Sequence, residues 1–234
     1  MTHAITPGFP AKWLRDRLEI VPREMALFEA AFTHRSAPGR INNERLEFLG
    51  DAVLNLLAAE LLYQRFPTAS EGDLSRLRAR LVSTGPLAEA AQSLGLGDAL
   101  RLGSGELKTG GFRRESILAD ALEALIGAVY LDAGLEAARA VVVRFCEPLI
   151  DSLPPPEDLK DPKTRLQELL QGRGLALPEY RVEQVSGEPH LQHFSVRCEV
   201  PELHIATVGE GSSRRRAEQD AAQRVLDGLT GEVR

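Results

Sequence analysis

The sequence of 234 residues is poor in cysteine, with only Cys146 and Cys198. The two lie far apart and fit no metal-binding spacing, so we expect reduced thiols rather than disulfides or a zinc site. No apolar run approaches the ~18 residues of a membrane-spanning helix, and residues 1–20 lack the apolar core of a signal peptide. The sequence therefore predicts a cytoplasmic protein with no membrane association.

A positive net charge is also absent, because 28 Lys and Arg stand against 34 Asp and Glu, a formal net charge of −6. Neither residues 1–159 nor residues 160–234 are basic overall. A general electrostatic attraction to nucleic acid is therefore excluded, and any such binding must come from local clusters of cations. The hydrophobic share of 43% nevertheless indicates folded domains rather than a disordered chain.

Two regions of different character follow each other along the chain. Residues 1–150 are rich in Leu, Ala and Glu and poor in β-branched residues, which predicts an all-α domain. Residues 151–160 hold three consecutive prolines and several acids, which predicts a linker. Residues 161–231 combine helical ends with alternating β-branched segments and predict a small α+β domain. The predicted fold class is therefore multidomain.

Apolar spacing and capping residues locate the individual elements. The clearest helix is predicted over 43–66, where Asn42 or Asn43 can cap the start and Pro67 follows the end. Other helices are predicted over 71–82, 84–94, 116–131, 135–149, 162–171 and 213–229, and strands over 180–185, 191–200 and 203–208. The second domain thus has the predicted order α-β-β-β-α.

Acidic side chains interrupt two unusually apolar predicted helices. Asp120 and Glu123 are the only ionisable residues in the middle of one, and their spacing places them on one face. Glu44, Glu47 and Asp51 share one narrow stripe of the other. Ionised carboxylates in apolar surroundings are costly unless a partner compensates them. One interpretation is a shared site for an oxygen-binding cation, Mg²⁺ or Mn²⁺; the other is a solvent-facing stripe paired with Arg or Lys.

Three consecutive arginines, 214 to 216, fill the first turn of the last predicted helix, behind Ser212 or Ser213 as the cap. Cations at this end oppose the helix dipole. The placement becomes favourable when phosphate oxygens accept hydrogen bonds from the free N–H groups at the start of the helix. The alternative is a solvated basic patch.

Longer segments of the chain resemble the ribonuclease III family. In the first domain these are AFTHRS from Ala31, NERLEFLGDAVL from Asn43, EGDLSRLRARLVS from Glu71 and KTGGFRRESILADALEALIGA from Lys108. The last region resembles a double-stranded-RNA-binding domain in DPKTRLQELLQ from Asp161, GEPHLQHFSVRC from Gly187 and GEGSSRRRAEQDAA from Gly209. The segments occur in family order and together cover most of the chain.

The resemblance implies that four acids, Glu47, Asp51, Asp120 and Glu123, bind the metal ions of catalysis. Among them, Asp51 and Glu123 are assigned as the most direct catalytic ligands. The implied cofactor is Mg²⁺, for which Mn²⁺ can substitute.

Four further residues lie in or beside the matched segments. Glu44 and Glu71 match two secondary acids associated with the site and the subunit interface. Phe48 matches an aromatic residue that packs into the partner subunit in family dimers, while plain core packing is the alternative from sequence alone. His34 is expected to make structural hydrogen bonds rather than to act as a base.

The resemblance also implies an RNA-binding surface in the second domain, made of Gln167, Glu168, His190, Arg214, Arg215 and Arg216. The first two match positions that face the RNA minor groove, the histidine matches a loop residue that reaches an adjacent minor groove, and the arginines match phosphate contacts. Glu218 departs from the best-known pattern, which has a lysine there, and this departure predicts somewhat weaker RNA binding. Lys108, Arg113 and Arg114 are either further phosphate contacts or solvated.

The function implied by the resemblance is hydrolysis of double-stranded RNA by a homodimer. Two symmetric sites would cut the two strands and leave 5′-phosphate and 3′-hydroxyl ends with two-nucleotide 3′ overhangs. Precursors of ribosomal, messenger and transfer RNA are the expected substrates. One alternative is a dimer that binds double-stranded RNA without cutting it. Another is a metal-dependent hydrolase of small phosphate esters.

Overall fold

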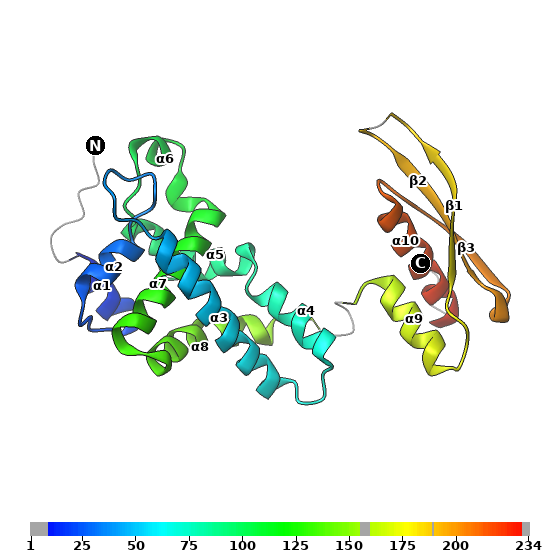
Figure 1. The fold of residues 1–234 in the computed structure, drawn as a ribbon, viewed down its shortest axis with the longest axis horizontal. Helices are drawn as coiled ribbons and strands as arrows, with labels where there is room; N and C mark the ends of the chain where they lie inside the picture. Colours follow the sequence, from blue (N-terminus) through cyan, green and yellow to red (C-terminus); the bar gives the residue numbers. More distant parts are fainter. Residues whose placement is uncertain (1–8, 155–159, 189, 231–234) are drawn as a thin grey trace. The chain divides into compact units, whose positions relative to one another are not determined.

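The computed structural model describes residues 9–154, 160–188 and 190–230 (Figure 1). The chain divides into two compact units, Met1–Pro154 and Pro155–Arg234. The predicted linker over 151–160 includes residues 155–159, which lie outside the described residues. At its start, Asp151 still belongs to the last helix of the first unit.

The first unit is helical, as predicted, and β-type pairing in its described residues is limited to one isolated bridge between Thr33 and Arg101. Its α-helices are α1 (Phe9–Leu18), α2 (Met25–Ala31), α3 (Glu44–Arg65), α4 (Glu71–Leu81), α5 (Thr84–Ser93), α6 (Ser104–Lys108), α7 (Glu115–Ala133) and α8 (Leu135–Asp151). The predicted helices over 43–149 agree with α3, α4, α5, α7 and α8 to within two residues at each end. The short helices α1, α2 and α6 have no separate sequence prediction.

Helix α7 runs through the middle of the first unit and packs against α2, α3, α5 and α8 (Figure 1). Its sequence explains this position, because apolar residues occur on every side of the helix. Of its 19 residues, 12 are buried. The few polar side chains of α7 therefore project from a rigid, well-packed scaffold.

The start of α3 is capped from two residues away. The side-chain oxygen of Asn42 accepts a hydrogen bond from the backbone N–H of Glu44 at 3.2 Å. Asn43 is buried and makes no side-chain cap bond. Asn42 is therefore the capping residue of the two that the sequence allowed.

Helices α3 and α7 approach each other backbone to backbone, with Gly50 and Gly127 at the contact. A Cβ atom on Gly50 would lie 1.7 Å from the carbonyl oxygen of Glu123. A Cβ atom on Gly127 would lie 2.4 Å from the carbonyl oxygen of Leu46. Since both obstacles are backbone atoms, no side-chain movement could relieve such a clash. Glycine at these two positions sets the distance between the helices.

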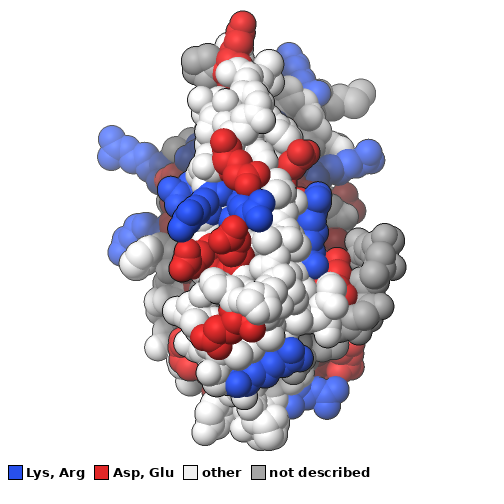
Figure 2. All heavy atoms as spheres, turned by 90° about the vertical axis from the view of Figure 1, so that its right-hand side faces the viewer, with Lys and Arg blue, Asp and Glu red and all other residues white. Residues whose placement is uncertain are grey.

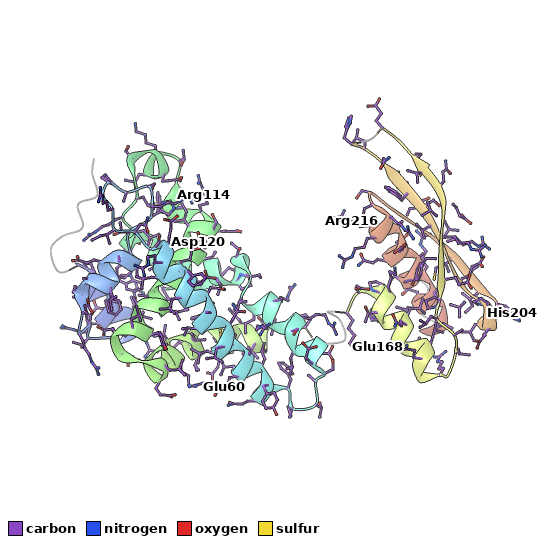
Figure 3. The ribbon with its side chains drawn as sticks, viewed as in Figure 1. Glu60, Arg114, Asp120, Glu168, His204 and Arg216 are labelled. Carbon is purple, nitrogen blue, oxygen red and sulfur yellow. The ribbon has the colours of Figure 1, made fainter. Side chains whose placement is uncertain are left out.

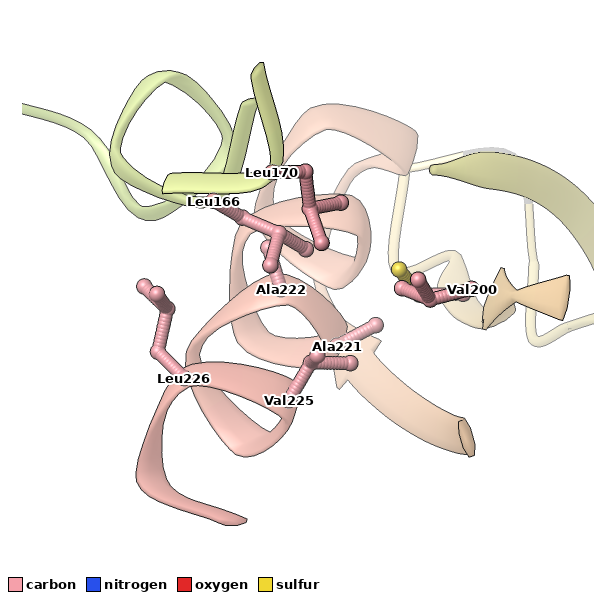
Figure 4. Packing of buried hydrophobic residues seen from close by; sticks show 8 residues of the cluster. Leu166, Leu170, Val200, Ala221, Ala222, Val225 and Leu226 are labelled. Carbon is pink, nitrogen blue, oxygen red and sulfur yellow. The ribbon is translucent and has the colours of Figure 1, made fainter. Parts of the chain in front are cut away.

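The second unit is a three-stranded antiparallel sheet with two helices packed on one face. Its elements are α9 (Pro162–Gly172), β1 (Glu179–Ser186), β2 (His193–Val200), β3 (Ile205–Gly211) and α10 (Arg214–Thr230), with strand order β1-β2-β3. Leu166 and Leu170 of α9 meet Val225 of α10 and Val200 of β2 in a small core (Figure 4). Gly209 lets α10 lie close to β3, because a Cβ atom there would be 2.1 Å from the backbone nitrogen of Ala221. The predicted order α-β-β-β-α is confirmed.

The strand boundaries in the second unit differ from the sequence prediction between β2 and β3. Leu203 was expected in β3 but lies in a short 3₁₀ turn, Pro201–Leu203. His204 follows with φ of 53°, so the chain reverses before Ile205 starts the strand. Pro201 explains the break, because it donates no backbone hydrogen bond to a sheet.

Both cysteines are free and fully buried. Burial raises the pKa of the Cys146 thiol to about 12. The pKa of the Cys198 thiol is also raised, chiefly by burial. None of the helices in the described ranges combines the length and apolarity needed to span a bilayer.

The contact between α3 and α7 predicts that Gly50→Ala destabilises the protein strongly. The added methyl group must push apart two helix backbones, and overpacking of this kind costs about 1–3 kcal/mol or more. Gly85→Ala is the matched control, because nothing lies within 4 Å of a Cβ at that helical position; it should be neutral or stabilising by up to about 1 kcal/mol. Thermal melting of the two variants checks this, and equal melting temperatures would contradict it.

Candidate active site and nucleic-acid interface

Three of the predicted acids converge where α3 crosses α7. Glu47 lies one turn before Gly50, and Glu123 lies one turn before Gly127, so the close approach of the backbones brings both side chains to one place. Glu47, Asp120 and Glu123 each offer a carboxylate oxygen, and these oxygens lie within 4.8 Å of one another. All three side chains are half-buried. The arrangement can hold a cation with oxygen ligands.

The acids in this cluster disfavour one another's charge. The pKa of Glu123 is raised to about 7, first by burial and then by the negative charges of Asp51, Asp120 and Glu47. Burial also raises the pKa of Glu47, with added repulsion from Asp120 and Glu44. Burial raises the pKa of Asp120 too, although His34 and Arg35 oppose this. Burial, with added repulsion at Glu47 and Glu123, outweighs the opposing effect of His34 and Arg35. A bound metal ion would therefore relieve the unfavourable charge.

Asp51 lies next to this cluster rather than in it. Its side chain is exposed, and one carboxylate oxygen accepts a hydrogen bond from the amide of Asn55 at 2.8 Å. Its charge is nevertheless the largest electrostatic contribution to the raised pKa of Glu123. The role of Asp51 as a direct metal ligand therefore stays a prediction, and Asn55 is a neighbour that sequence reasoning did not single out.

A pocket of about 270 Å³ opens beside the acids and has both signs of charge on its walls. Its residues include Glu47 and Asp120, together with Arg35 and Arg114, and Figure 3 shows Arg114 and Asp120 close together. Arg114 is held by an ion pair of 3.0 Å with Glu106. Arg35 and Glu106 were not among the predicted site residues, because neither forms a regular spacing with the acids.

His34 lines the same pocket and makes a structural hydrogen bond. Its Nδ1 lies 2.8 Å from the hydroxyl of Ser36, which in turn accepts a hydrogen bond from the backbone N–H of Gly103 at 3.0 Å. Burial lowers the pKa of His34. These contacts support the predicted structural role of this side chain.

The two secondary acids lie in different places. Glu44 lines the pocket and pairs with Arg35 at 3.6 Å. Glu71 starts α4, beyond the far end of α3, a helix that extends about 33 Å at 1.5 Å per residue. Its carboxylate accepts a hydrogen bond from Ser75 at 2.9 Å, so within one chain Glu71 does not join the acidic cluster.

Helix α3 also carries an exposed apolar stripe. Phe48 is 80% exposed, and Leu56 and Tyr63 follow on the same side of the helix at 56% and 72%. Leu56 and Tyr63 line a groove of about 500 Å³ between α3 and α4, and Glu71 lines the same groove. In this chain Phe48 is therefore not a core residue, and the alternative of plain core packing is wrong. An exposed stripe of this kind marks an interaction surface.

The predicted RNA-contact residues of the second unit are all exposed. Gln167 and Glu168 lie on α9, and Glu168 forms an ion pair of 2.6 Å with Lys160. His190 lies in the β1–β2 connection, with Nε2 at 3.7 Å from Glu188. Figure 3 shows Glu168 and Arg216 on the helical side of this unit, away from the sheet.

The three arginines occupy the first turn of α10, as predicted. Ser213 is the cap, because its hydroxyl oxygen accepts a hydrogen bond from the backbone N–H of Arg216 at 3.3 Å. Seen from the side on which the sheet lies, the surface mixes basic and acidic side chains instead of forming a basic field (Figure 2). Arg197 on β2, for example, pairs with both Glu183 and Glu199. The cluster of arginines on the helical side is thus a local feature.

Comparison with known proteins agrees with this combination of units. The family profile described as Ribonuclease-III-like matches residues 24–149, and the double-stranded RNA binding motif matches residues 162–229. Ribonuclease 3 of Methylococcus capsulatus is 56% identical over 94% of this chain and 96% of its own length. Ribonuclease 3 of Vibrio cholerae is 52% identical over 94% of this chain and 98% of its own length.

The solved nuclease domain of ribonuclease III from Campylobacter jejuni has a similar fold. It superposes with a TM-score of 0.57 and 45% sequence identity, and the match covers 58% of this chain and 96% of that domain. The Campylobacter domain is described as flexible in a region involved in dimer formation.

A helical unit with a carboxylate cluster, joined to a double-stranded RNA binding motif, defines an endonuclease that acts on double-stranded RNA. The chain belongs to the ribonuclease III family.

The raised pKa of Glu123 predicts that this side chain lowers stability when no metal is bound. The folded-state pKa, about 7, exceeds the ordinary value of 4.5, so the folded chain holds an extra proton between these values and loses stability as the pH rises through this window. In metal-free buffer at pH 8, Glu123→Gln should therefore melt higher than the wild type, by about 2–4 °C per kcal/mol gained. At pH 6 the difference should shrink.

Glu89→Gln is the control for this experiment, because it removes an exposed carboxyl on α5 and should show no such gain. A lower melting temperature of Glu123→Gln at pH 8 without metal would rule out the electrostatic cost.

Proposed function

We propose that this chain is a Mg²⁺-dependent endoribonuclease that cuts both strands of double-stranded RNA as a homodimer. The observation that carries the proposal is the cluster of Glu47, Asp120 and Glu123 at the glycine contact of α3 and α7. Asp51 adds a fourth carboxylate beside it.

The cluster suits a hard divalent cation. The three grouped ligands are all carboxylates, with no cysteine or histidine among them, and oxygen ligands favour Mg²⁺ or Mn²⁺ over zinc. Burial of the negative charge is the first cause that raises the pKa of each member, and a bound cation would stabilise that charge. Mg²⁺ is the proposed cofactor, and Mn²⁺ is expected to substitute.

In the proposed mechanism, Glu47, Asp120 and Glu123 would hold the cation, with Asp51 as a further ligand. A divalent ion held by these carboxylates would make water more acidic and would offset charge on the reacting phosphate. Glu123 must lose its proton to act as a ligand, and its pKa of about 7 in the metal-free site means that protons compete with the cation for this carboxylate on the acid side of neutrality. Attack of a water oxygen on phosphorus would break the P–O3′ bond, and a proton taken up by the departing 3′ oxygen would leave the proposed 5′-phosphate and 3′-hydroxyl ends.

The second unit is proposed to select the duplex by its shape. Side chains cannot read the deep major groove of A-form RNA, whereas the minor groove exposes 2′-hydroxyls. Gln167 and Glu168 on α9 and His190 in the β1–β2 connection are exposed and available for such contacts. Arg214, Arg215 and Arg216 are proposed to contact phosphates, alongside the start of α10.

The homodimer proposal rests on the apolar stripe of α3. In a twofold interface, residue i of one copy meets residue j of the other, and j meets i. Phe48 and Tyr63 lie at opposite ends of the stripe, so a twofold axis near its middle would bring Phe48 of one copy to the groove beside Tyr63 of the other. The same pairing would bring Glu71, which lines that groove, toward the acids of the second copy. Two equivalent sites across the duplex would then yield the proposed two-nucleotide 3′ overhangs.

The proposed substrates are structured precursors of ribosomal, messenger and transfer RNA. The proposed location is the cytoplasm, which the two free, buried thiols support.

Cleavage of duplex RNA in Mg²⁺ tests the catalytic assignment. Glu123→Gln should bind the duplex like the wild type but cut it more than about 100-fold more slowly, because the amide is a poor metal ligand while the RNA contacts lie in the second unit. Glu89→Gln should cut normally. Normal cleavage by Glu123→Gln would contradict the assignment, and a wild type that binds but never cuts in Mg²⁺ or Mn²⁺ would support the non-cleaving dimer instead.

Molar mass in solution tests the dimer. Phe48→Arg should yield monomers, since a charge placed on the stripe would be buried without a partner. Val21→Arg is the control, because Val21 is 70% exposed but lies outside α3. Light scattering after size-exclusion chromatography measures the mass, and a dimeric Phe48→Arg variant would place the interface elsewhere.

A further inference from the structure

Glu218 stands where a basic residue would be expected on the RNA-binding helix, yet it does not face solvent. It lies one turn after Arg214 on α10, and only 8% of the residue is exposed. A buried carboxylate is stable only when cations or donors satisfy it. The structure supplies two cations, one for each carboxylate oxygen.

The first cation belongs to the same helix. Arg214 Nε lies 2.8 Å from Oε1 of Glu218, an i, i+4 pair whose arginine is 64% exposed at the side chain. Arg214 thus has its Nε engaged by Glu218 while most of its side chain remains accessible. This leaves guanidinium donors that can meet a phosphate.

The second cation comes from the other helix. Lys163, in the first turn of α9, places Nζ 2.5 Å from Oε2 of Glu218 and 4.3 Å from the ring centre of Tyr180 on β1. Lys163 at the start of a helix opposes that helix dipole, and Glu218 compensates it. One carboxylate therefore joins the starts of α9 and α10, the two helices that carry Gln167, Glu168 and the arginines.

The protonation behaviour of Glu218 agrees with this joining role. Burial by itself would raise the pKa of Glu218, but hydrogen bonds from Lys163 and Arg214 outweigh it, so the pKa lies below the ordinary value. Glu218 is thus ionised and paired at neutral pH.

We propose that Glu218 is a positioning residue for double-stranded RNA, which fixes Arg214 for a phosphate contact and holds the start of α9 beside it. The inference rests on the proposed RNA contact of Arg214. For the loss of the Glu218 charge, this positioning role predicts a change in RNA affinity opposite to the one that net charge alone predicts. Removing a negative charge beside three arginines should strengthen RNA binding if charge alone matters, but should weaken it if Glu218 positions Arg214.

A double-mutant cycle tests this with the full chain and a duplex longer than the about 16 base pairs such a domain spans, without divalent metal so that the RNA stays intact. Glu218→Gln should weaken binding several-fold and lower the salt slope of the binding constant by about 1, as for the loss of one phosphate contact. Arg214→Ala should do the same. The double variant should bind like Arg214→Ala alone, because Glu218 acts through that residue.

Glu210→Gln is the matched control, because it removes one exposed carboxyl from the same unit on β3. It should leave binding unchanged or slightly tighter. Should Glu218→Gln fail to fold, Glu218→Asp takes its place in the cycle, because the shorter side chain cannot reach both cations.

Two results would overturn the inference in distinguishable ways. If Arg214→Ala weakens binding while Glu218→Gln binds as tightly as Glu210→Gln, or if the two losses add, Glu218 does not position Arg214, and the proposed RNA contact survives. If Arg214→Ala leaves binding and its salt slope unchanged, the RNA contact itself is wrong, and the positioning role falls with it.

Discussion

The contact between Gly50 and Gly127 is the constraint on which the active site depends. Backbone atoms, not side chains, meet there, and each glycine is preceded one turn earlier by an acid of the cluster. A larger residue at either position would move α3 away from α7 and carry Glu47 away from Glu123. The spacing of the carboxylates is therefore set by helix packing, and α7, buried along most of its length, supplies the rigidity.

This packing holds together groups that repel one another. The energy of folding keeps three half-buried carboxylates close, although burial raises the pKa of each and repulsion by neighbouring acids adds to the shifts of Glu47 and Glu123. Such an arrangement is typical of functional sites, where stability is lower than the scaffold would allow. In the second unit the outcome is the opposite, because Lys163 and Arg214 satisfy the buried carboxylate of Glu218 and favour a fixed geometry.

Much of the fold and of the candidate site could be predicted from sequence, because local patterns of apolar and polar residues were sufficient. The apolar surroundings of Asp120 and Glu123 indicated one buried helix, and the alternation in the last region indicated the sheet. Sequence could not show that Asp51 turns toward Asn55, since a shared helical stripe does not determine which rotamer a side chain adopts. Nor could it show that Glu218 pairs with Lys163, a residue 55 positions away, because the pairing depends on how α9 packs beside α10.

The burial of Cys146 and Cys198 makes the chain well suited to chemical labelling. Both thiols are inaccessible and hold their protons at neutral pH, so labelling reagents that react with exposed thiolates should leave them unmodified. A single cysteine introduced on the surface of each unit would then be the only reactive pair. Fluorophores or spin labels at such a pair would report the separation of the two units, free and on RNA, without removing either native cysteine.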